Sequence, residues 1–150
     1  MKRILIYILA LAAALAVPLQ GIDVGKLQPV GVVKLYKEDE HTVIVTDTGD
    51  SGAGDQVAAA FRDLEQTTAG IVFLDTADYL LLSPDAADSL QELSVYLKPN
   101  VRVCLAEREI DPVQAAEYLN IHRPTVKLRD CGSTENLPEL VQENGRLKLK

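Results

Sequence analysis

The chain has 150 residues, which is enough for one domain with a hydrophobic core and too few for two. Its composition, 47% hydrophobic and 25% charged, is globular and excludes long disordered stretches as the default. A formal net charge of -7 disfavours binding to nucleic-acid phosphates, so we expect no nucleic-acid partner.

The first residues have the order of an export signal. Two basic residues precede Ile4 to Val17, a run without a charge, and a proline and a glycine follow it. This order is typical of a secretory leader, and Ala14-Leu15-Ala16 offers the small residues that a signal peptidase needs. An uncleaved anchor is the alternative, although the run is shorter than the roughly 20 residues that span a bilayer. We expect 1–22 to be a signal peptide or membrane anchor and 23–150 a single extracytoplasmic α/β domain.

The next part of the chain predicts a β-hairpin, a loop and a helix. Val30 to Tyr36 and the β-branched Val43 to Val45 flank a charged segment, which is typical of a hairpin. Three glycines within Thr48 to Asp55 predict a flexible loop. Apolar residues then recur at helical spacing from Val57 to Leu64, so we expect an amphipathic helix that ends near Thr67.

Two apolar runs follow this helix. Ile71 to Leu74 is apolar throughout, which favours a strand covered on both faces at the centre of a sheet. Tyr79 to Leu82 is a second extended run. Ser83 and Pro84 then supply an N-cap and a proline at the first helical position, so we expect a helix that continues to Leu97.

The last third predicts two strands and two helices. Val101 to Leu105 alternates as a strand, and Asp111-Pro112 repeats the cap and proline before a short helix to Asn120. Val126 to Arg129 predicts a short strand, and Asn136 to Glu143 a final helix. The order is ββαβ(β)αβαβα. It favours an α+β or α/β fold, a mixed β-sheet with helices packed on it.

A group of aspartates marks one candidate site. Asp47, Asp50 and Asp55 lie on the glycine-rich loop, and carboxylate oxygens on such a loop suit a hard cation such as calcium. Asp47-Thr48-Gly49 also resembles the loop of aspartic proteases, but Asp50 adds a charge beside the dyad that this chemistry needs. The two histidines, His41 and His122, have no metal-site spacing. We therefore assign no catalytic and no cofactor-binding residue.

Two cysteines and a group of C-terminal cations are the remaining candidates for a disulfide or a binding site. Cys104 lies within a predicted strand and Cys131 just after another, so a disulfide needs those strands to be neighbours, and buried free thiols are the alternative. Arg146, Lys148 and Lys150 form the only basic cluster, which we interpret as a solvated tail.

The element order resembles a known family. The predicted elements begin with a strand pair, Val30 to Val33 and Thr42 to Val45, and a helix from Val57 to Leu64. The two apolar runs and the helix from Pro84 to Leu97 come next. This order resembles that of the N-terminal domain of the Ger(x)C family, the C subunits of spore germinant receptors. The resemblance covers Leu27 to about Asn120. It implies a non-enzymatic domain on the outer membrane face, although the family's lipidated cysteine and later domains are missing here.

These observations give one main functional hypothesis and one alternative. We expect a non-catalytic extracytoplasmic domain that acts through protein-protein contacts, in the context of spore germination or the cell envelope. Its partners are then other envelope or membrane proteins, and the N-terminal segment contacts the membrane if it is uncleaved. The alternative is a small secreted hydrolase or cation-binding protein that uses Asp47 to Asp55.

Overall fold

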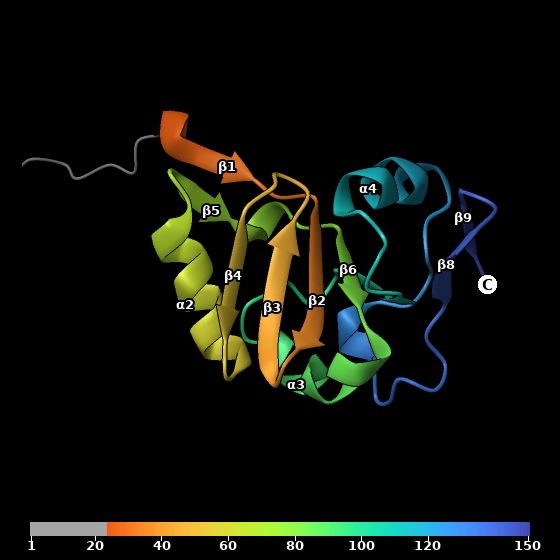
Figure 1. The fold of residues 1–150 in the computed structure, drawn as a ribbon. Helices are drawn as coiled ribbons and strands as arrows, with labels where there is room; N and C mark the ends of the chain where they lie inside the picture. The colour runs from red at the N-terminus through yellow and green to blue at the C-terminus, as the bar shows by residue number, and fades with distance from the viewer. Residues whose placement is uncertain (1–23) are drawn as a thin grey trace, which may run out of the picture.

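The structure, a computed structural model, describes residues 24–150 and centres on one mixed β-sheet. The seven strands of this sheet, in the described residues, lie in the order β4-β3-β2-β6-β7-β8-β9 (Figure 1). The parallel strands are β2 (Val32–Glu38), β6 (Tyr79–Leu82), β7 (Arg102–Ala106) and β8 (Glu139–Glu143). The antiparallel ones are β3 (His41–Thr46), β4 (Ser51–Gly54) and β9 (Arg146–Leu149). The expected mixed sheet in a single domain is confirmed.

Helices cover both faces of the sheet and create two hydrophobic clusters. On one face lie α2 (Val57–Thr67), a 3₁₀ helix (Pro84–Ser89) and α3 (Leu90–Leu93). On the other lies α4 (Pro112–Ile121). Strand β6 contributes alternate residues to both clusters and is buried along its whole length, so it forms the centre of the core.

Several predicted elements are confirmed. The hairpin of β2 and β3, the helix α2 and the strand β7 lie where the sequence places them. Helix α4 begins as expected, because the Asp111 side chain accepts a hydrogen bond from the Val113 N–H and Pro112 occupies the first turn. The helix expected from Pro84 to Leu97 is shorter, a 3₁₀ segment that passes into the single α-helical turn of α3.

The predicted loop from Thr48 to Asp55 is wrong, because β4 lies within it. Its glycines permit close packing of α2 on the strand. A Cβ atom at Gly52 would lie 2.3 Å from the Leu64 nitrogen and 2.4 Å from the Ala60 oxygen. The residue pattern that resembles a flexible loop is therefore a strand whose side chains are small enough for a helix backbone to approach.

The prediction that Ile71 to Leu74 forms the sheet centre is also wrong. Strand β5 (Ile71–Phe73) pairs in parallel with β1 (Leu27–Pro29) in a separate two-stranded sheet. Ile71 is 43% exposed, whereas all four residues of β6 are buried. Both segments are short apolar runs, and their periodicity alone does not determine which of them becomes central.

The C-terminal region differs most from the prediction. Lys127 makes only an isolated bridge to Arg102, and a 3₁₀ helix (Leu128–Asp130) replaces the expected strand. The helix expected from Asn136 to Glu143 is instead β8, joined to β9 by a tight turn. Asn144 and Gly145 have φ angles of 51° and 75°, which match a type I′ hairpin turn. The Asn-Gly pair was the sequence signal for this hairpin.

The predicted leader, residues 1–22, lies outside the described residues. Within 24–150, no helix is long and apolar enough to cross a membrane.

Candidate functional site

The three candidate aspartates do not form one site. At the β3–β4 turn, both carboxylate oxygens of Asp47 accept a hydrogen bond from the Gly31 N–H, at 3.0 and 3.2 Å, and Asp50 accepts one from the Thr48 hydroxyl. Asp55 lies past the opposite end of β4. It pairs there with the Nδ1 atom of His41 at 2.9 Å. Among residues 24–150, no group of three or more His, Cys, Asp or Glu side chains could hold a metal ion.

The two cysteines lie on opposite faces of the sheet. Cys104 belongs to the cluster beneath α4, whereas Cys131 packs against the cluster beneath α2. Both are free thiols, and the Sγ of Cys131 donates a hydrogen bond to the Lys127 carbonyl oxygen at 3.1 Å. The disulfide that the sequence left open is not formed in the structure.

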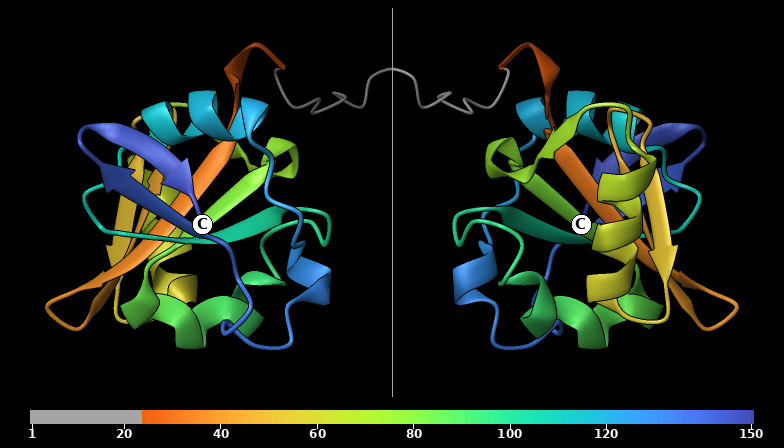
Figure 2. Two further views of the ribbon diagram at one scale, coloured as in Figure 1. Left: turned by 90° about the vertical axis from the view of Figure 1, so that its right-hand side faces the viewer. Right: turned by 90° about the vertical axis from the view of Figure 1, so that its left-hand side faces the viewer.

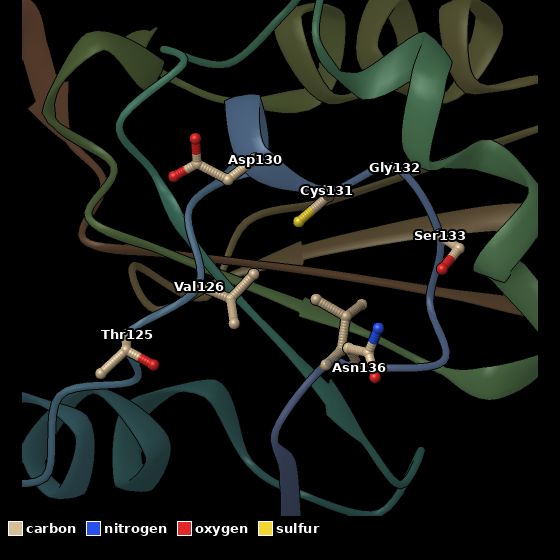
Figure 3. Close-up of a pocket in the computed structure, with 8 residues that line it drawn as sticks. Thr125, Val126, Asp130, Cys131, Gly132, Ser133 and Asn136 are labelled. Carbon is tan, nitrogen blue, oxygen red and sulfur yellow. The ribbon is translucent and has the colours of Figure 1, made fainter.

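Cys131 lies in a pocket of about 580 Å³ (Figure 3). The side chains of Cys131 and Val126 point into it, whereas the carboxylate of Asp130 points away. The lining consists of Thr125, Val126, Asp130, Cys131, Gly132, Ser133, Asn136 and Leu137. Burial, and secondarily the negative charge of Asp130, raises the pKa of the Cys131 thiol, which disfavours the nucleophilic thiolate. The lining also contains no histidine that could act as a base.

One edge of the main sheet is closed by the helix beside it. The outward backbone groups of β4 bind side chains of α2. Asp63 accepts a hydrogen bond from the Ala53 N–H at 2.9 Å, and the Thr67 hydroxyl donates one to the Ser51 carbonyl oxygen at 3.0 Å. Because these main-chain groups are satisfied, β4 offers little to an additional strand.

The opposite edge, β9, is largely open. Glu139 and Lys150 exchange N–H···O bonds, so Leu147 and Leu149, at alternate positions, turn their main-chain groups away from β8. The Leu149 N–H donates to the Tyr118 hydroxyl of α4 at 3.1 Å. The main-chain groups of Leu147 find no partner in the part of the chain that the structure describes.

An apolar groove runs between this open edge and α4. In the left view of Figure 2, the blue hairpin of β8 and β9 lies beside the cyan helix α4. The groove has a volume of about 420 Å³ and is lined by Gln114, Glu117, Tyr118, Ile121, Arg146 and Leu147. Ile121 is 78% exposed although it is large and apolar. An edge strand with free main-chain groups and an apolar groove beside it is an arrangement that can bind an extended peptide.

Sequence reasoning missed this surface because it interpreted Arg146, Lys148 and Lys150 as a solvated tail. They alternate with Leu147 and Leu149, which pack against the α4 cluster. This alternation, directly after Asn-Gly, was the signal that would have identified the strand.

Comparison of the chain with family models, with curated proteins and with solved structures finds no match.

Proposed function

We propose that this protein is a non-catalytic extracytoplasmic domain that works through protein-protein contacts, in the context of spore germination or of the cell envelope. The observation that carries the proposal is the difference between the two edges of the sheet. Side chains of α2 bind the outward main chain of β4, whereas the main-chain groups of Leu147 in β9 have no partner within residues 24–150 and lie beside an apolar groove. Edge strands are a liability that proteins usually cover, so an open one next to exposed apolar surface favours a binding role.

The location and the cellular context rest on the sequence. The basic start and the apolar run of Ile4 to Val17 support export. The order that the sequence predicts, a hairpin, a helix, two short apolar runs and a further helix, resembles that of the N-terminal domain of the Ger(x)C family. The pocket around Cys131 supports the non-catalytic role, because the thiol pKa is raised and no histidine is among the residues that line it.

Site-specific photo-crosslinking in the producing cell tests the proposal. A photoreactive residue replaces Leu147 on the open edge, and, as a matched control, Ala53 on the closed edge. We expect a discrete adduct with a different protein from position 147 and none from position 53. Absence of any adduct at 147, or equal adducts from both positions, would contradict a contact through β9.

A further inference from the structure

We propose that the groove between β9 and α4 binds an extended segment of a partner protein in which apolar and acidic residues alternate. This inference rests on the proposed function, because it specifies the partner of the same open edge. Three features of the groove carry it: the free main-chain groups, the alternation of side chains along β9, and the distribution of charge on its two faces.

The main chain of β9 supports addition of a short strand. The N–H and C=O of Leu147 point away from β8 and are available for pairing. At the other end, the Tyr118 hydroxyl occupies the Leu149 N–H and joins α4 to the strand. Because the Leu149 N–H is already bonded, an added strand pairs mainly around Leu147.

The side chains of β9 determine which residues the partner places on each face. Leu147 and Leu149 face α4, and the alternate cationic residues face the other way. On the α4 side, an added strand meets Ile121, Tyr118 and Leu147, which favour an apolar side chain. Glu117 and Arg146 line the same groove with opposite charges, so the groove offers an acidic side chain no net attraction.

The opposite face of β9 favours an acidic side chain. Glu143 pairs with Lys148 of the strand and with Lys150 directly after it, with its oxygens 3.6 Å from the Lys148 Nζ and 2.6 Å from the Lys150 Nζ. Arg146 has no ion pair among the described residues and lines the groove. A carboxylate of the added strand beside Arg146 would form an ion pair with its guanidinium group.

The same charges disfavour a second copy of this chain as the occupant. Antiparallel pairing of two β9 strands about Lys148 would place the two Lys148 residues opposite each other and Arg146 opposite Lys150. Like charges directly opposite each other destabilise a strand pair. A different protein with acidic side chains is therefore the better fit.

Binding of fluorescent peptides to the full chain in detergent tests this inference. The probes are an alternating Glu-Val hexapeptide, an alternating Lys-Val hexapeptide, and a block isomer with three Glu followed by three Val. Fluorescence anisotropy at low salt should show that the alternating Glu-Val peptide binds about tenfold more tightly than the other two. Equal affinity for the block isomer would overturn the inference, because strand pairing requires the alternation.

Three variants locate the binding. Reversing charge with Arg146→Glu and Lys148→Glu should switch the preference to the Lys-Val peptide, whereas Arg62→Glu on the exposed side of α2 should leave it unchanged. Ile121→Ser changes a side chain that is 78% exposed, so it should keep the fold and weaken Glu-Val binding several-fold. Binding that is insensitive to Ile121→Ser places the peptide elsewhere and overturns the inference.

The peptide and cross-linking results separate the two proposals. If Leu147 cross-links to a different protein but the Glu-Val peptide does not bind, the contact role stands and the partner chemistry proposed here is wrong. If position 147 yields only dimers of this chain, β9 pairs with a second copy and both proposals fail.

Discussion

At the scale of single residues, Lys34 is the most unusual side chain. It lies on β2, is 5% exposed, and donates hydrogen bonds from its Nζ to the carbonyl oxygens of Arg108 and Ile110, the latter at 2.7 Å. These bonds join β2 to the loop that precedes α4. Burial lowers the pKa of Lys34, and the nearby charges of Glu109 and Asp111 offset part of this effect.

This lowered pKa gives a prediction about stability and pH. Between the lowered pKa of Lys34 in the folded chain and its ordinary value near 10.5 in the unfolded chain, the unfolded state binds more protons at this site than the folded state, so stability from Lys34 rises with pH. The difference in free energy of unfolding between the wild type and Lys34→Met should grow in favour of the wild type as the pH rises toward about 10. Urea titrations measure it, and exposed Lys98→Met is the control. A difference that is constant with pH would contradict the prediction.

The thiols give a second prediction at this scale. Burial raises the pKa of Cys104 to about 12, and Cys131 is only partly buried. In the folded chain at about pH 8, a maleimide should therefore label Cys131 slowly and leave Cys104 unmodified. Mass spectrometry of the labelled protein checks this. In denaturant without reductant, both thiols should react. A requirement for prior reduction would reveal a disulfide and show that the arrangement described above is wrong.

At the scale of elements, sequence patterns succeeded where one face of a segment dictates its burial. The alternation of β3 and the amphipathic spacing of α2 were sufficient to locate those elements. Sequence patterns failed where tertiary packing determines the secondary structure or the strand pairing of a segment. Ser51 to Gly54 has little strand propensity and becomes β4 because α2 packs on its glycines, and Ile71 to Phe73 is too short an apolar run to reveal that it pairs outside the main sheet.

The contact between α2 and β4 gives a prediction about an element. Gly52→Ala places a Cβ atom against backbone atoms of Leu64 and Ala60, which cannot move away as a flexible side chain would. It should lower the free energy of unfolding by about 3 kcal/mol. Gly132→Ala is the matched control, because a Cβ there meets nothing within 4 Å, and it should change stability by less than about 0.5 kcal/mol. Chemical denaturation compares the two, and equal effects would show that β4 and α2 are not packed this closely.

At the scale of the whole molecule, the two edges of the sheet differ in how their outward main-chain groups are hydrogen-bonded. The α2 edge satisfies its outward main chain with Asp63 and Thr67, whereas the β9 edge relies on one tyrosine and on cationic side chains. None of this surface was predicted as a binding site, because it forms only where β9 lies beside α4. These two elements are distant in the sequence and come together only in the tertiary fold. The Asp47, Asp50 and Asp55 group was predicted from proximity in sequence, and a strand separates its members.

The last prediction concerns the division of the chain at about residue 23. The sequence places the domain boundary near residue 23, so we predict that a chain that lacks 1–22 keeps the unfolding temperature of the full chain. The same deletion should abolish export if the apolar run is a leader or anchor. Alkaline phosphatase fused after Lys150 reports on this, because the enzyme is active only outside the cytoplasm. We expect activity with the full chain and none after the deletion, and activity in neither fusion would contradict export. The mass of the mature protein then distinguishes cleavage after Ala16 from a retained anchor.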